Sequence, residues 1–180
     1  QLYHNATHDA VTGLPNRSLL MDRLNQSLVR AKRRRQRLVI AVFGLDRIKR
    51  VNDNLGLNVG DNILKDITKR LVKELRESDT LARLGGEEFV LVLPDCGGTE
   101  TAMKIIDRMV AIISRPIKIR NTETSITCSV GCSSYPEDGA SASSLLRFAD
   151  SAMYQAKENG CNRVQIHNQI LREHLQQLFH

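Results

Sequence analysis

The sequence predicts an α/β (α+β) fold in which helices pack on a single mixed β-sheet. Four segments place apolar residues at the spacing of an amphipathic helix, and they cover residues 18–34, 60–76, 99–114 and 143–159. Runs rich in β-branched residues separate these helices, and two of the runs contain turn residues as β-hairpins do. Helices that alternate with hairpins are typical of a ferredoxin-like or palm-like sandwich.

The strands follow from two kinds of pattern. The continuous apolar run over residues 38–43 suits a strand buried on both faces, so we expect it near the centre of the sheet. Residues 79–93 predict one hairpin, and the alternation over residues 117–119 and 124–131 predicts a second. Two shorter elements are expected, a helical turn at residues 47–53 and a strand at 163–166.

The chain has the length and composition of one globular domain, with 180 residues of which 41% are hydrophobic and 26% charged. We divide it into an N-terminal segment at residues 1–17, the main domain at 8–167 and a C-terminal linker helix at 168–180. Gly13 and Pro15 predict a loop in the first segment, and Asn16 is placed to cap the first long helix.

Several classes of protein do not fit the sequence. It has no run of about 18 apolar residues and no apolar signal-peptide core near Gln1, so we expect a soluble piece of a longer protein whose parent can be anchored in a membrane. Its four cysteines form no C-x-x-C pair, which predicts reduced thiols and a cytoplasmic location.

A basic run covers residues 30–37 and contributes to a net charge of +6. We interpret it as the solvated last turns of a helix, where cations complement the helix dipole. A polynucleotide surface is disfavoured because the chain has no Trp and few aromatic residues to stack on bases. The positive charge would still help to gather a small anion such as a nucleoside triphosphate.

The stretch from Arg83 to Phe89 places acid at the tip of the first hairpin. Gly85 and Gly86 allow a sharp turn, and two carboxylates follow at Glu87 and Glu88. Adjacent carboxylates repel each other, so they are stable chiefly beside a cation, which predicts a metal site. A solvated turn that keeps the hairpin soluble is the alternative.

The sequence resembles the GGDEF family of diguanylate cyclases. The family's motif appears as Gly-Gly-Glu-Glu-Phe at residues 85–89, and further motifs lie in the family's order at residues 9–17, 49–53, 60–61 and 149–157. The resemblance implies a nucleotidyl-cyclase or polymerase-palm-like fold. It also implies condensation of two GTP molecules into cyclic di-GMP, with Mg²⁺ or Mn²⁺ as cofactor, in a homodimer whose two domains face each other.

The resemblance also assigns roles to individual residues. Glu87 and Glu88 correspond to catalytic carboxylates and metal ligands, together with the backbone carbonyl of Leu45. The implied GTP-binding residues are Lys49, Asn52, Asp61 and Lys157, of which Asp61 falls in the first turn of its predicted helix. Arg76 and Asp79 match the family's R-x-x-D site for inhibitory product.

Two departures from the family's pattern bear on activity. Gly44 stands where the family usually has a metal-binding aspartate, and Cys161 where it usually has a phosphate-contacting arginine. Because side chains alternate along a strand, we expect Asp46 to project from the opposite face and not to replace the missing carboxylate. Both departures predict weaker binding of metal and phosphate.

Two hypotheses of function follow. The first is a diguanylate cyclase of reduced activity. The second is a non-catalytic domain that binds GTP or cyclic di-GMP and controls a neighbouring phosphodiesterase domain of EAL type. The motif order and the C-terminal helix resemble chains in which such a domain follows and a sensory domain precedes.

Overall fold

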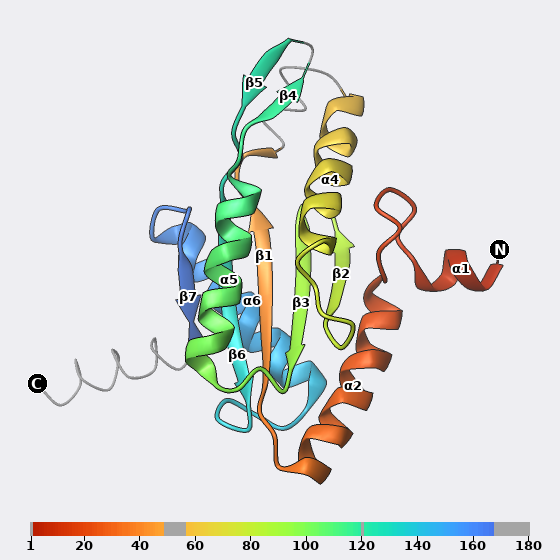
Figure 1. Ribbon diagram of the computed structural model, residues 1–180, viewed down its shortest axis with the longest axis vertical. Coiled ribbons are helices and arrows are strands. Elements are labelled where there is room, and N and C mark those ends of the chain that lie inside the picture. Colours follow the sequence, from red (N-terminus) through yellow and green to blue (C-terminus); the bar gives the residue numbers. More distant parts are fainter. Residues whose placement is uncertain (1, 49–56, 120, 168–180) are drawn as a thin grey trace, which may run out of the picture.

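The computed structural model describes residues 2–48, 57–119 and 121–167. Its main sheet has five strands in the order β2-β3-β1-β6-β7, with helices on both faces (Figure 1). The strands of this sheet are β1 (Leu38–Leu45), β2 (Thr80–Gly85), β3 (Glu88–Pro94), β6 (Cys128–Tyr135) and β7 (Val164–Ile166). The helices are α1 (Leu2–Thr7), α2 (Arg17–Arg34), α4 (Leu57–Val72), α5 (Thr99–Ile113) and α6 (Ala142–Glu158).

Strand β1 forms the centre of the sheet, as its apolar run predicts. It pairs antiparallel with β3 on one side and with β6 on the other, and all eight of its residues are buried. Strand β7 adds to β6 in parallel. The mixed sheet of the predicted α/β class is therefore confirmed.

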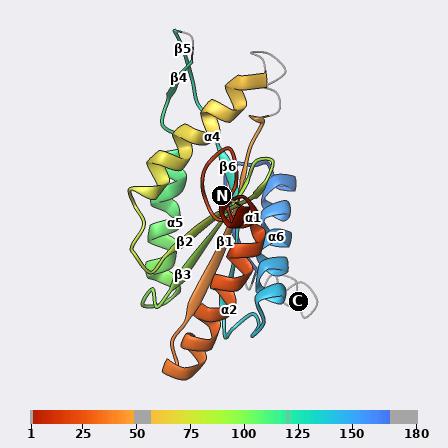
Figure 2. The same cartoon turned by 90° about the vertical axis from the view of Figure 1, so that its right-hand side faces the viewer.

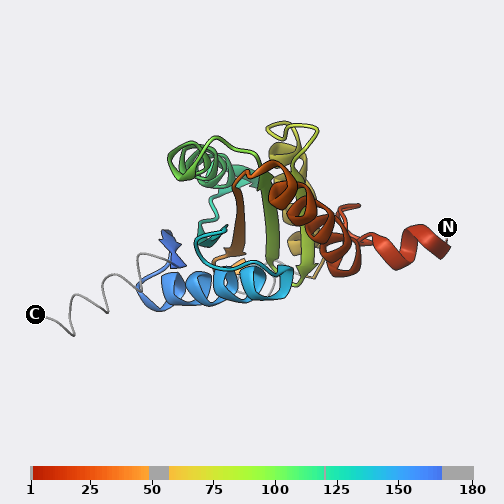
Figure 3. The same cartoon turned by 90° about the horizontal axis from the view of Figure 1, so that it is seen from below.

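The side chains of β1 divide the core into two layers. Val39, Ala41 and Phe43 pack with α4 and α5, whereas Ile40 and Val42 pack with α2 and α6. Figures 2 and 3 show α5 and α6 on opposite sides of the sheet. Residue 44 continues the even-numbered set, so it faces α6.

The long helices begin and end close to their predicted bounds, but the second one is shifted. Helix α4 begins at Leu57 and ends at Val72, so Asp61 lies beyond the first turn in which the sequence places it. The backbone N–H groups of Glu74 and Leu75 bond three residues back, to Leu71 and Val72, which tightens the chain and ends the helix.

The predicted second hairpin is wrong in its partner. Strand β4 (Ile117–Ile119) pairs with β5 (Thr122–Thr124) as a separate two-stranded sheet. The following strand begins only at Cys128 and joins the main sheet beside β1. Residues 124–131 alternate throughout, so the pattern does not show that one strand ends and another begins there.

The N-terminal segment contains a helix that the sequence analysis expects as loop. Helix α1 covers six residues, too few to show an apolar repeat. Asn16 caps α2 as predicted, since its side chain accepts a hydrogen bond from the Leu19 N–H. The linker helix at 168–180 and most of the turn at 47–53 lie outside the described residues. No helix in the described part is long and apolar enough to cross a bilayer.

Candidate functional site

The β2–β3 turn lies beside the C-terminal end of β1. The Leu45 N–H donates to the Glu87 carbonyl at 3.0 Å, and Gly44 pairs with Glu88 across the two strands. The turn itself depends on its glycines, because Gly85 and Gly86 have φ angles of 126° and 54°. The predicted hairpin with acid at its tip is confirmed.

The two glutamates of the turn face opposite sides of the sheet. Glu88 is paired with Gly44 and therefore shares its face, toward α2 and α6. It lines a pocket of about 340 Å³ together with Arg17, Leu84, Ser143, Leu146, Arg147 and Asp150. Glu87 lines a different pocket of about 290 Å³, with Ile48, Gly60, Asp61, Leu64, Arg83 and Gly86. The structure thus brings together Glu87 and Asp61 and separates Glu88 from both.

The other residues assigned to GTP are only partly placed. Lys49 and Asn52 lie outside the described residues. Lys157, near the end of α6, reaches the end of β1, where its Nζ donates to the Leu45 carbonyl and to Asp46 Oδ1, both at 3.2 Å. Lys157 lines neither glutamate pocket.

Asp46 accepts hydrogen bonds from several segments at this edge of the sheet. Its side chain is 1% exposed and pairs with Lys157. It also accepts hydrogen bonds from the Thr127 and Ser129 hydroxyls and the Asn162 N–H. Burial acts to raise the pKa of Asp46, but these hydrogen bonds outweigh it and hold the pKa below its ordinary value. The carboxylate is therefore ionised and ties together three segments distant in the sequence.

The expectation that Asp46 projects from the face opposite residue 44 is wrong. A Cβ built on Gly44 would lie 3.3 Å from Lys157 Nζ, and Asp46 bonds that same nitrogen. Residues two apart along a strand share a face, so alternation supports this placement.

Arg83 connects the turn to the N-terminal segment, a role that the sequence analysis missed. Its guanidinium donates to the Gly86 carbonyl at 2.7 Å and to both carboxylate oxygens of Asp9 at 3.0 Å. Burial acts to raise the pKa of Asp9, but hydrogen bonds from Thr12 and Arg83 lower it below its ordinary value. Asp9 belongs to the motif at residues 9–17, and Arg83 lies two residues before the motif at 85–89, but no local pattern pairs them across 74 residues.

The described residues do not form a preformed metal site. No three His, Cys, Asp or Glu side chains in this part of the chain are grouped so that they could hold an ion. Gly44 offers no side chain, the Leu45 carbonyl already accepts from Lys157, and the two glutamates line different pockets. The donor set therefore does not fit a divalent cation held by the protein alone. The assignment of Leu45, Glu87 and Glu88 as ligands stays a prediction.

Cys161 lies in a loop of left-handed backbone after α6. Its φ is 64° and that of Asn162 is 48°, and the Cys161 thiol contacts the Lys157 carbonyl at 3.6 Å. A thiol adds no positive charge here, so the phosphate contact that the resemblance associates with this position is absent.

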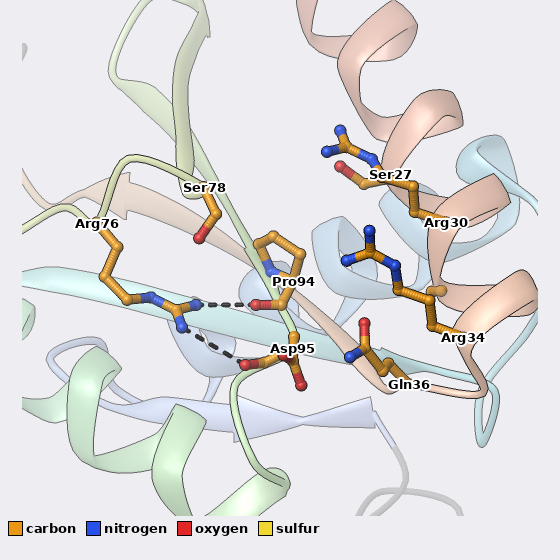
Figure 4. Close-up of a pocket in the computed structure, with 9 residues that line it drawn as sticks. Ser27, Arg30, Arg34, Gln36, Arg76, Ser78, Pro94 and Asp95 are labelled. Carbon is orange, nitrogen blue, oxygen red and sulfur yellow. Dashed lines mark hydrogen bonds between the residues drawn. The ribbon is translucent and has the colours of Figure 1, made fainter.

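Arg76 of the R-x-x-D pair lines a separate pocket of about 160 Å³ at the other end of β3, and Asp79 is not among the residues that line it (Figure 4). Arg76 pairs with Asp79 at 2.9 Å and also donates to the carbonyls of Pro94 and Asp95. Figure 4 shows Arg30 and Arg34 reaching from α2 toward this pocket. The basic run thus supplies two more guanidinium groups, a role that the sequence analysis did not assign to it.

The surroundings of Glu88 disfavour its negative charge, so neutralising this residue is expected to stabilise the fold. Burial raises the pKa of Glu88, and the negative charge of Asp150 raises it further. Ionising Glu88 therefore costs more free energy in the folded protein than in the unfolded chain, which lowers the stability of the fold. This loss of stability is fully present at a pH above the raised pKa of Glu88 and absent at a pH below the ordinary pKa of glutamate. We expect Glu88→Gln to raise the melting temperature at pH 7.5.

The same experiment at pH 4 checks the cause. Because pH 4 lies below the ordinary value of 4.5 from which the pKa of Glu88 is raised, most of the cost of ionisation is absent there and the gain should be smaller. The exposed Glu158→Gln is the matched control and should change little at either pH. A gain that is equal at both pH values would contradict the electrostatic explanation.

Comparison with known proteins identifies the family to which this sequence is similar. The family model described as "Diguanylate cyclase, GGDEF domain" matches residues 6–163. The chain is 40% identical over 157 residues to the diguanylate cyclase TpbB of Pseudomonas aeruginosa, covering 87% of this chain and 36% of TpbB. It is also 40% identical over 162 residues to MucR, a bifunctional diguanylate cyclase/cyclic di-GMP phosphodiesterase of the same organism, covering 90% of this chain and 24% of MucR.

Solved structures of two such domains have the same fold. The TpbB GGDEF domain matches with a TM-score of 0.86 and 35% identity, over 92% of this chain and 99% of that one. The GGDEF domain of DgcB from Caulobacter crescentus, solved with cyclic di-GMP, matches with a TM-score of 0.84 and 28% identity, over 91% and 96%. The nucleotidyl-cyclase palm-like fold is thereby confirmed, and the chain belongs to the GGDEF family of diguanylate cyclases.

Proposed function

We propose that this domain condenses two GTP molecules into cyclic di-GMP, with activity reduced by Gly44 and Cys161. The observation that carries the proposal is the position of the Gly85–Phe89 turn against the end of β1 in a chain of this family. In the reaction each 3′-hydroxyl attacks the α-phosphorus of the other GTP. Two P–O bonds form, two pyrophosphates leave, and each hydroxyl gives up its proton.

The residues around the turn are assigned complementary roles. Glu87 is the carboxylate proposed to take the hydroxyl proton, and Asp61 in the same pocket is proposed to accept from the guanine N–H groups. Lys157 is proposed to contact phosphate once nucleotide is bound. Lys49 and Asn52 complete the proposed GTP site.

The proposed reaction also needs a divalent metal ion and a second copy of the domain. The family is generally metal-dependent, and we propose Mg²⁺ or Mn²⁺ that enters with the triphosphate, because the protein oxygens alone do not form a cage. Since the product has two-fold symmetry and each domain would hold one GTP, catalysis requires a homodimer.

We propose that the protein acts in the cytoplasm. We also propose that Arg76 and Asp79 bind cyclic di-GMP, which then inhibits the enzyme as its product.

Glu87→Ala tests the proposal directly. Purified protein is incubated with GTP and Mg²⁺ or Mn²⁺, and cyclic di-GMP is quantified by chromatography. We expect slow product formation by the parent chain and a loss of at least about 100-fold in Glu87→Ala, because positioned general bases contribute on this scale. Glu123→Ala, which removes an exposed carboxylate outside the pocket and away from the R-x-x-D segment, should retain the parent rate.

A regulatory domain is the second candidate, favoured by Gly44 and by the arginine pocket around Arg76. In this case the domain binds GTP or cyclic di-GMP and controls a neighbouring EAL phosphodiesterase, and the similarity to bifunctional MucR supports such a context. The chain spans about a third or a quarter of these relatives, 36% of TpbB and 24% of MucR. Retained GTP binding without any turnover would overturn the catalytic proposal in favour of this one.

A further inference from the structure

The end of β1 already holds a positive charge. Lys157 Nζ lies 3.2 Å from the Leu45 carbonyl oxygen and 3.2 Å from Asp46 Oδ1. The lysine side chain is 29% exposed, whereas that of Asp46 is 1% exposed, so the ion pair is anchored on a buried carboxylate. Charge-assisted hydrogen bonds of this kind hold the ammonium in a fixed position.

The absence of a side chain at Gly44 leaves the room for this arrangement. A Cβ built at Gly44 would lie 2.8 Å from Lys157 Cε, 3.3 Å from its Nζ and 2.7 Å from Met153 Sδ. These distances are shorter than ordinary van der Waals contact, so any side chain at 44 would have to displace the end of the lysine. The lysine thus fills the space that the family's aspartate would use.

A divalent cation at this edge would need the same oxygens. Hard cations bind carboxylate and carbonyl oxygens, and Lys157 bonds the Leu45 carbonyl oxygen and Oδ1 of Asp46. The other oxygen of Asp46 accepts from Thr127 and the Asn162 N–H. An ammonium within a few ångströms repels a second cation, and this repulsion is strong where burial limits screening by water. Gly44 also supplies no carboxylate whose negative charge would offset this repulsion.

We propose that Lys157 is a built-in cation that excludes a divalent metal ion from the oxygens at the end of β1 in the nucleotide-free domain. The inference rests on the proposed function only in placing a metal at this edge of the sheet. Its test measures metal binding without nucleotide, so its failure and the failure of cyclase activity are separate outcomes.

The experiment titrates the nucleotide-free 180-residue chain with Mn²⁺ and follows free Mn²⁺ by electron paramagnetic resonance. Lys157→Met removes the ammonium and leaves the Leu45 and Asp46 oxygens in place. We expect Mn²⁺ to bind about tenfold more tightly to this variant than to the parent chain, because a nearby positive charge is removed. Lys157→Arg keeps a cation and should bind as the parent does.

Two further variants keep the result interpretable. Lys65→Met removes an exposed lysine of α4 and controls for the loss of one positive charge. Lys157→Gln is neutral but can still donate to Asp46, so it decides the question where circular dichroism shows Lys157→Met to be unfolded. Tighter Mn²⁺ binding by the folded neutral variants alone supports the proposal, and binding no tighter than in Lys65→Met overturns it.

Discussion

Replacing Gly131 with alanine is expected to prevent α6 from packing on the sheet. A Cβ at this position would lie 2.0 Å from the Ala149 carbonyl oxygen and 2.1 Å from the Met153 nitrogen. Both atoms belong to the helix backbone, which cannot rotate away as a side chain can. The strand or the helix would have to move, and Ser133, two residues along β6, would lose its hydrogen bond to the Leu145 carbonyl.

The expected cost is a loss of at least about 3 kcal/mol in the free energy of unfolding, at the upper end of the range for overpacked cores. Urea denaturation followed by circular dichroism measures it. Gly139→Ala is the matched control, because the nearest atom to its new Cβ would be 3.6 Å away. We expect that change to cost less than about 1 kcal/mol. Equal losses in the two variants would show that the helix adjusts easily.

Local patterns account for much of the fold. The apolar run at 38–43 predicts a buried central strand, and the glycines at 85–86 predict an acidic hairpin. Both predictions succeed because each feature depends on residues that are neighbours in the sequence. The same patterns do not separate β5 from β6, since alternation continues across both. Helix α1 is too short to show a repeat.

The candidate site is less accessible to sequence reasoning because it depends on distant contacts. Asp46 meets Lys157 across 111 positions and Asn162 across 116. Nothing in the residues near Asp46 indicates these partners. Strand alternation places Glu87 and Glu88 on opposite sides and residues 44 and 46 on the same side. The expectation that Asp46 faces away from residue 44 misapplied this rule, so the local part of the geometry was available from the pattern.

Gly44→Asp is expected to raise metal-dependent formation of cyclic di-GMP by about tenfold or more, since hard-cation sites gain affinity from each added carboxylate. Gly44 pairs directly with Glu88, so the new carboxylate would stand beside an existing one. Its Cβ would displace Met153 Sδ and Lys157 Cε, so the substitution also costs stability by disturbing the ion pair of Lys157 with Asp46.

The same substitution should make the fold itself depend on metal. Without a cation, two neighbouring carboxylates repel each other and lower the melting temperature, and Mn²⁺ should restore it by binding the folded state. Gly44→Asn makes nearly the same steric demand without the charge, so it should gain neither activity nor stabilisation by Mn²⁺. If the asparagine variant gains as much as the aspartate variant, displacement of Lys157 is the cause. If Gly44→Asp binds Mn²⁺ but its rate is unchanged, the missing carboxylate does not limit catalysis.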